Sequence, residues 1–291
     1  MKYDNGSAFR RALEDRLRTM SMQTGMSLTR LRKMVVFDRY LARLLHYQPG
    51  RWILKGGLAL QLRLGVEART TKDIDLLLLD IQQNILLALR SAGALDLNDW
   101  FSFEIGNPQI ETDEVGGKRY PVRAILDTRD FETFHIDIGM TDALIEAPDQ
   151  LTTPELLTFA DIQPTIIPCY PLTQQISEKL HAYTRLHASG ESSRVKDFVN
   201  MLLIASLAEF QADRLHKAIE VTFLQRGTHP FPKLLPEPSG NWATTFKKLS
   251  KDVGAGFPSL DETFLMLQKF LNPILSDSPV THWDSIHWQW D

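Results

Sequence analysis

The sequence predicts a mixed α/β (α+β) protein, with a core built on a small mixed sheet and a helical carboxy-terminal domain after it. Short apolar runs with strand character alternate with helical runs between residues 50 and 145. From Leu172 onward the strand signals fade while helical spacing continues. The 291 residues, 43% of them hydrophobic, are enough for one large globular domain or two modest ones.

The amino-terminal half is expected to begin with helices at 8–22 and 28–47, the second with leucine and valine at helical spacing. Trp52-Ile53-Leu54 then forms a short strand that ends at the pair Gly56-Gly57, and good helix formers follow. Further along we expect a strand from Asp73 to Leu79, a helix from Gln82 to Gly93, and strands at 100–105, 119–126 and 132–139.

The carboxy-terminal half is expected to contain helices at 172–189, 193–208, 211–225, 241–251 and 260–275. Four prolines between Thr228 and Gly240 predict a loop there. These elements suggest three parts: a helical cap over 1–49, the α/β core over 50–170, and a helical domain over 171–291.

Composition places the chain among ordinary globular proteins. The single cysteine, Cys169, permits no internal disulfide, and no secretory signal is recognisable at the amino terminus. The longest apolar runs are too short to cross a bilayer, so we expect no membrane partner and a cytoplasmic location.

The net charge of −4 hides an asymmetry. Residues 1–50 contain ten Lys or Arg and four Asp or Glu, a surplus of six positive charges, so the remainder carries −10. A basic amino-terminal segment could lie along a phosphate backbone, although a solvated helix face explains the charge about as well. The acidic remainder argues against a large cationic surface elsewhere.

The first group of chemically informative residues follows the strand at 52–54. Gly56 and Gly57 let the backbone approach a phosphate, and the helix after them directs its first N–H groups at such an anion. Asp73 and Asp75 alternate along the next strand and project from one face, about 7 Å apart at their Cα atoms. Paired carboxylates with oxygen ligands only are suited to Mg²⁺ or Mn²⁺. Either motif alone is common by chance, and only their order along the chain gives them weight.

A third carboxylate, Asp137, lies in the alternating strand His135-Ile136-Asp137-Ile138-Gly139. A lone strand aspartate is usually solvent-exposed, but this one could complete a two-metal site with Asp73 and Asp75. His135 shares the face of Asp137, and we interpret it as a hydrogen-bonding neighbour rather than a ligand, because magnesium prefers oxygen.

The helical half carries a third group. Lys179 is expected at the edge of a helix, where a lysine is normally solvated. Arg194, Lys196 and Asp197 begin the next helix, where the aspartate suits the positive end of the helix dipole and the two cations do not. A bound triphosphate would supply the anion that compensates these cations.

Taken together, these motifs resemble the AbiEii/AbiGii toxin family of nucleotidyltransferases, which includes the MenT toxins and has the DNA polymerase β superfold. The resemblance covers roughly residues 30–205 and rests on Leu54-Lys55-Gly56-Gly57-Leu58-Ala59-Leu60, Arg69-x-Thr71-x-Asp73-Ile74-Asp75, His135-x-Asp137-x-Gly139, Glu178-Lys179-Leu180 and Arg194-x-Lys196-Asp197. It implies that residues 50–170 are the catalytic core and that the helical domain completes the nucleotide site.

The resemblance also assigns roles to individual residues. Asp73, Asp75 and Asp137 are implied to be catalytic and to hold metal, and Lys179 to be catalytic as well. The nucleotide is implied to be bound by Lys55, Gly56, Gly57, Arg69, Thr71, Lys179, Arg194, Lys196 and Asp197. One departure is Asn200, at a position where family members often carry an acidic residue; its amide can form hydrogen bonds but brings no negative charge.

The implied activity is transfer of a nucleoside monophosphate from an NTP to an acceptor hydroxyl, with the 3′ end of tRNA as the expected acceptor and a cognate antitoxin protein as a partner. One alternative keeps the chemistry with a small molecule, such as an aminoglycoside, or a protein side chain as acceptor. A second alternative is a non-catalytic nucleotide-binding or protein-interaction module. The aromatic tail with Trp283, Trp288 and Trp290 could bind a partner, but packing onto the helices is the simpler explanation.

Overall fold

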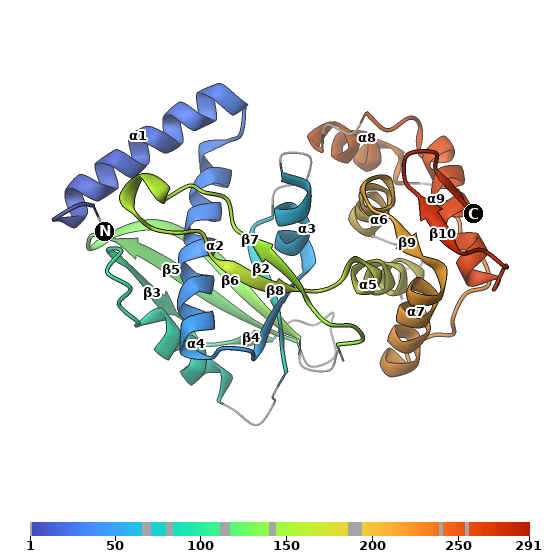
Figure 1. Cartoon of the computed structure of the whole chain (residues 1–291), viewed down its shortest axis with the longest axis horizontal. Helices are drawn as coiled ribbons and strands as arrows, with labels where there is room; N and C mark the ends of the chain where they lie inside the picture. Colours follow the sequence, from blue (N-terminus) through green and yellow to red (C-terminus); the bar gives the residue numbers. More distant parts are fainter. Residues whose placement is uncertain are drawn as a thin grey trace. The chain divides into compact units, whose positions relative to one another are not determined.

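The computed structural model describes residues 2–65, 71–79, 84–110, 117–139, 144–185, 194–238, 241–253 and 256–291. The chain divides into two compact units (Figure 1). Unit 1 comprises Met1–Val66, Thr70–Ala143 and Pro148–Cys169, and unit 2 contains Leu144–Ala147 and Tyr170–Asp291. The first two helices therefore belong to the same unit as the sheet, and a separate amino-terminal cap stays a prediction.

Unit 1 is built on an eight-stranded mixed sheet in the order β3-β5-β6-β2-β1-β8-β7, with β4 paired to β5. Its strands are β1 (Trp52–Lys55), β2 (Asp73–Leu78), β3 (Phe101–Ile105), β4 (Gln109–Ile110), β5 (Lys118–Leu126), β6 (Arg129–Gly139), β7 (Asp149–Thr152) and β8 (Ile166–Cys169). The pairs β2–β6 and β1–β8 are parallel and the others antiparallel. The mixed α/β class is confirmed, but the sheet is larger than expected, because β4, β7 and β8 are too short or too polar to show an alternating pattern.

The helices of unit 1 are α1 (Gly6–Thr24), α2 (Leu28–Tyr47), α3 (Gly56–Leu64) and α4 (Ile85–Gly93), with a 3₁₀ turn at Thr158–Ala160. Side chains of Asn5 and Ser27 accept hydrogen bonds from the first turns of α1 and α2 and fix where these helices begin. The long helix α2 crosses one face of the sheet (Figure 1) and buries Leu31, Val35 and Leu41 in the core.

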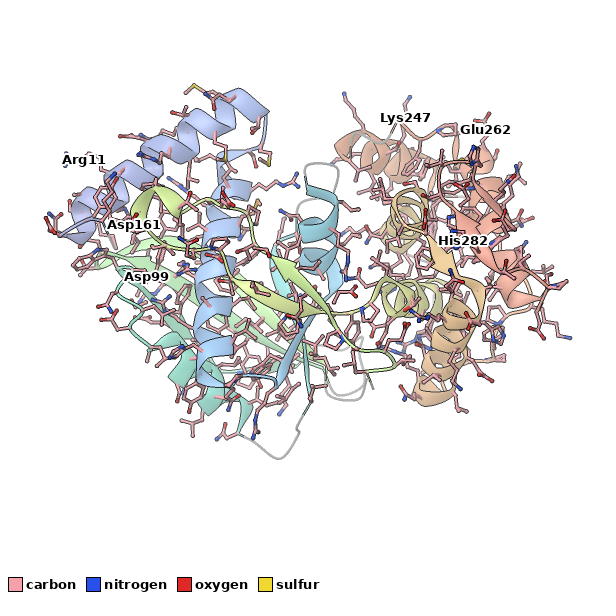
Figure 2. The ribbon with its side chains drawn as sticks, in the orientation of Figure 1. Arg11, Asp99, Asp161, Lys247, Glu262 and His282 are labelled. Carbon is pink, nitrogen blue, oxygen red and sulfur yellow. The ribbon has the colours of Figure 1, made fainter. Side chains whose placement is uncertain are left out.

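Many of the basic side chains of α1 and α2 form hydrogen bonds and ion pairs within unit 1. Arg43 is completely buried and donates to the carboxylate of Asp99 at 2.9 Å and to the carbonyl of Phe101 at 2.7 Å. Asp99 lies beside α2 (Figure 2) and also accepts from Arg39 at 3.4 Å. Arg10 donates to three main-chain carbonyls between Leu126 and Asp130. Much of the positive charge of this segment therefore holds unit 1 together and does not form a cationic surface.

Unit 2 contains the helices α5 (Leu172–Thr184), α6 (Val195–Leu207), α7 (Ala212–Arg226), α8 (Ala243–Asp252) and α9 (Leu260–Leu275). The helical character expected from the sequence is confirmed, although α5 ends at Thr184 and residues 186–189 lie outside the described residues. A three-stranded sheet of β9 (Phe210–Gln211), β10 (His282–Asp284) and β11 (Gln289–Trp290) was not expected, because strands of two or three residues leave no periodic pattern.

The aromatic tail packs onto the helices of unit 2. Trp283 is fully buried and its indole N–H donates to the carbonyl of Ala205 at 2.8 Å. Trp288 and Trp290 donate to main-chain carbonyls of α9 at 3.0 and 2.8 Å. The tail is therefore a structural element that packs onto the helices, as the simpler explanation predicted. Among the described residues, no helix is both long and apolar enough to span a membrane.

Candidate active site

The glycine turn connects β1 to α3 and is held by Asp75. Gly56 has φ +64°, and a Cβ atom added there would collide with the carboxylate of Asp75. The N–H of Gly57, in the first turn of α3, donates to Oδ2 of Asp75 at 3.3 Å. A carboxylate is stabilised at the positive end of a helix dipole. The carboxylate of Asp75 thus accepts the hydrogen bond of the Gly57 N–H, which the sequence predicts to face a phosphate.

Replacing Gly56 with alanine is expected to reduce the nucleotidyl transfer that the family resemblance implies by more than about a hundredfold, because the added methyl group must displace Asp75. The positive φ adds about 1–2 kcal/mol of backbone strain. Gly25→Ala is the matched control, since Gly25 has φ +73° and open space around its Cβ position. Turnover and thermal unfolding would be measured for both. Similar activity losses in the two variants would show that backbone strain, and not the contact with Asp75, is responsible.

The three carboxylates lie on one face of two neighbouring parallel strands. In the β2–β6 register, Asp75 pairs with Asp137 and Asp73 pairs with His135. The intervening Ile74 and Ile136 are fully buried on the opposite face. Asp73 and Asp137 remain 27% and 19% exposed, so a ligand can reach their oxygens. Strand alternation therefore separates the apolar residues of the core from a solvent-accessible row of acids.

Arg119 on β5 bridges two of these carboxylates. It is the register partner of Asp137 and binds it through two parallel hydrogen bonds, Nε to Oδ1 at 2.8 Å and an Nη to Oδ2 at 2.6 Å. The same Nη lies 3.5 Å from Oδ2 of Asp73. His135 contacts the other oxygen of Asp73 through Nδ1 at 3.1 Å, as the hydrogen-bonding neighbour that the sequence predicts.

The donor set has the chemistry that a hard divalent cation requires. It offers carboxylate oxygens from adjacent strands, and one cationic group already lies within contact distance of two of them. In the described part of the chain, no three His, Cys, Asp or Glu side chains are close enough together to hold a metal ion as they stand. The residues fit such an ion in type and share one face of adjacent strands, and the assignment of Asp73, Asp75 and Asp137 as metal ligands stays a prediction.

Other predicted nucleotide-binding residues surround the glycine turn. Lys55 is the register partner of Asp75 and is buried to 8% exposure. Thr71 packs against Gly57; its hydroxyl donates to the carbonyl of Asp73 at 3.2 Å and its N–H to the side chain of Gln61 at 3.3 Å. Thr71 thus has a structural role in positioning the start of β2. Arg69 lies outside the described residues.

Cys169 pairs in register with Leu54 and is fully buried. Burial raises the pKa of the Cys169 thiol to about 12. At neutral pH this thiol is protonated, so it does not supply a nucleophile.

Unit 2 brings together a second group of the predicted residues. Lys179 on α5 lies 3.4 Å from Asp197 in the first turn of α6, and Arg194 lies 3.9 Å from the same carboxylate. Asp197 therefore provides part of the negative charge that compensates these cations. Lys196 is exposed, and Asn200 is buried at 6% exposure on α6. The structure thus places the predicted residues in two clusters, one in each unit.

Arg119 was not predicted from the sequence. The signal available was a basic residue at the start of the strand at 119–126, which by itself is ordinary. Its position depends on an irregularity in the β5–β6 pairing near Ala124, which shifts the register by one residue. Without that shift the register partner of Arg119 would be Ile136 and not Asp137. The face of Arg119 is set by β5 itself, where Tyr120 and Val122 are buried on the opposite side.

The fold is that of a nucleotidyltransferase. The structure resembles that of MenT4, a nucleotidyltransferase toxin from Mycobacterium tuberculosis H37Rv, with a TM-score of 0.55 and 14% sequence identity over 91% of this chain and 98% of that one. A proposed nucleotidyltransferase from H. pylori matches with a TM-score of 0.47 and 19% identity, over 87% of this chain and 97% of that one. No curated protein sequence matches the chain.

The sequence also matches a family model. The family is described as "Nucleotidyl transferase AbiEii toxin, Type IV TA system", and the match extends over residues 39–265. The chain belongs to this family. It is a nucleotidyltransferase toxin of a type IV toxin–antitoxin system, and the family resemblance read from the sequence motifs is confirmed.

Proposed function

We propose that this toxin transfers a nucleoside monophosphate from an NTP to a hydroxyl at the 3′ end of tRNA, with Asp73, Asp75 and Asp137 as its catalytic carboxylates. The observation that carries the proposal is the row of three acids on one face of β2 and β6, beside the glycine turn that begins α3. Charge neutralisation and positioning account for most of the catalysis of phosphoryl transfer, and this row would supply both through the divalent cation that it holds.

In the proposed reaction the acceptor oxygen forms a bond to the α-phosphorus while the bond to the bridging oxygen breaks. Pyrophosphate leaves with the electron pair, and the hydroxyl proton passes to a carboxylate or to water. Asp73, Asp75 and Asp137 would hold Mg²⁺ or Mn²⁺, which when bound activates the attacking hydroxyl and stabilises the leaving group. Lys179, Arg194, Lys196 and Asp197 are proposed to contact the nucleotide.

A polyanionic acceptor is supported by α8. Lys247 (Figure 2), Lys248 and Lys251 are all exposed on this helix. A cavity of about 710 Å³ borders it and is lined in part by the partly exposed ring of Phe257. Lysines bind phosphates and aromatic rings stack on bases, the combination by which proteins hold single-stranded nucleic acid. These features fit an unpaired RNA end better than a small cationic acceptor such as an aminoglycoside.

The activity would be tested with purified protein, Mg²⁺ and each labelled NTP in turn, against separate pools of total tRNA, small-molecule acceptors and protein. We expect the label to appear on tRNA. It should be released only when the 3′-terminal nucleotides of the tRNA are cleaved off. Label confined to an aminoglycoside or to protein would support nucleotidyl transfer but would refute tRNA as the acceptor. Nucleotide binding without transfer to any pool would refute the catalytic proposal. Co-expression with the neighbouring reading frame would test for a cognate antitoxin.

Substituting Lys247, Lys248 and Lys251 together with glutamine is expected to weaken tRNA binding about tenfold at ~0.1 M salt. The slope of the logarithm of the binding constant against the logarithm of salt concentration should fall by about two to three. A triple variant at Lys217, Lys233 and Lys269, which are exposed elsewhere in unit 2, is the matched control. Equal losses in the two triple variants would show a general charge effect, and would argue against α8 as the contact surface.

A further inference from the structure

The guanidinium of Arg119 occupies the centre of the acidic row. It binds both oxygens of Asp137, and one of its nitrogens also lies 3.5 Å from Asp73. Its side chain is 31% exposed, and it is contributed by β5, a different strand from those that carry the acids. One side chain therefore contacts Asp73 and Asp137 and remains accessible to solvent.

The physical role of this arrangement follows from charge. Neighbouring carboxylates repel each other unless a cation lies between them. A guanidinium is permanently charged, is weakly hydrated and matches a carboxylate with two parallel hydrogen bonds, so it is suited to hold such a site together. The same carboxylate oxygens are those that a divalent cation requires. Arg119 and a metal ion therefore compete for Asp137 and Asp73.

We propose that Arg119 is an exchangeable counter-ion: entry of the divalent cation displaces its guanidinium from Asp73 and Asp137, and the displaced guanidinium then binds a phosphate of the NTP. The second step rests on the proposed function. Because the metal must displace a cation, it binds weakly alone, and because the nucleotide accepts that cation, metal and NTP bind cooperatively. Arg119 is thus a positioning residue that couples the two ligands.

The first test measures Mn²⁺ binding in the absence of nucleotide, by electron paramagnetic resonance of unbound Mn²⁺. Arg119→Gln removes the competing charge, so we expect its Kd for Mn²⁺ to fall about tenfold relative to the wild type. Arg123→Gln is the matched control, because Arg123 lies four residues along the same strand and pairs instead with Glu104 and Asp130. Its Kd should equal that of the wild type.

The second test repeats the titration with an NTP analogue whose α,β-bridge is a methylene group. In the wild type the analogue should tighten Mn²⁺ binding by at least about tenfold, and in Arg119→Gln most of this coupling should be lost. Arg119→Lys keeps the charge without the paired hydrogen bonds, so its coupling between analogue and Mn²⁺ should lie between those of the wild type and Arg119→Gln. Circular dichroism and thermal unfolding confirm that each variant is folded.

Two outcomes overturn the inference. If folded Arg119→Gln binds Mn²⁺ no more tightly than the wild type, Arg119 does not compete with the metal. If the analogue still tightens Mn²⁺ binding in this variant as it does in the wild type, the guanidinium of Arg119 does not bind the phosphate. A wild type that binds no Mn²⁺ with or without nucleotide would instead refute the metal site itself, so the failures of the two proposals are distinguishable.

Discussion

Replacing Asp73 with asparagine is expected to reduce nucleotidyl transfer by at least about a thousandfold, equivalent to roughly 4 kcal/mol of transition-state stabilisation. Asparagine has the shape of aspartate but lacks its charge, so the row of acids loses one ligand for a cation without losing volume. Asp73 is 27% exposed and its contacts to Arg119 and His135 are 3.5 and 3.1 Å long. The free energy of unfolding should therefore change by less than about 1 kcal/mol.

The measurement is incorporation of label from an NTP into tRNA under single-turnover conditions. Asp130→Asn is the control, because Asp130 is an exposed acid on β6 that pairs with Arg123 at 3.1 Å. Its turnover should match that of the wild type. If Asp73→Asn kept activity within about tenfold of the wild type, the carboxylate would not be part of the catalytic site.

Replacing Asp99 with alanine is expected to destabilise unit 1 by about 3–5 kcal/mol, the usual cost of removing one partner from a buried ion pair. Arg43 is completely buried, and Asp99 is 1% exposed and accepts from both Arg43 and Arg39. The substitution leaves buried guanidinium groups without this counter-charge. Since 5–15 kcal/mol is the usual stability of a whole domain, the loss is large.

Thermal unfolding followed by circular dichroism should show the midpoint of unit 1 about 10 °C lower. Asp15→Ala provides the comparison, because Asp15 and Arg18 form an exposed pair at 3.5 Å on α1 and such pairs contribute less than about 1 kcal/mol. A double substitution, Asp99→Leu with Arg43→Met, should recover part of the loss, since apolar residues remove the unpaired charge. No recovery would indicate that packing around Asp99, rather than charge, determines the stability.

The sequence predicted the elements that carry the site because their signals are local. Strand alternation through Asp73, Ile74 and Asp75 predicted which residues enter the core, and Ile74 is fully buried. A glycine pair between an apolar strand and good helix formers predicted the β1–α3 turn, and Gly56 adopts the positive φ that favours glycine. Helical spacing predicted α2, and its bounds are those of the structure.

Other features were not visible because they involve partners distant in the sequence. Arg43 and Asp99 are separated by 56 residues, and nothing in either segment indicates that they pair. The same is true of the basic amino-terminal segment, where Arg10 binds the carbonyl of Leu126 and Arg39 the carboxylate of Asp99. Short strands such as β8 and β10 form only because a neighbouring strand satisfies their backbone groups.

By itself the sequence determined the family, the acidic row and the glycine turn, since alternation along a strand and the freedom of glycine are properties of a few adjacent residues. Only the tertiary structure decided that Asp75 pairs with Asp137 in parallel register and that Arg119 lies between Asp137 and Asp73. The reason is register: Arg119 lies opposite Asp137 because of a one-residue shift near Ala124, without which its partner on β6 would be Ile136. Such a shift depends on how two whole strands pair.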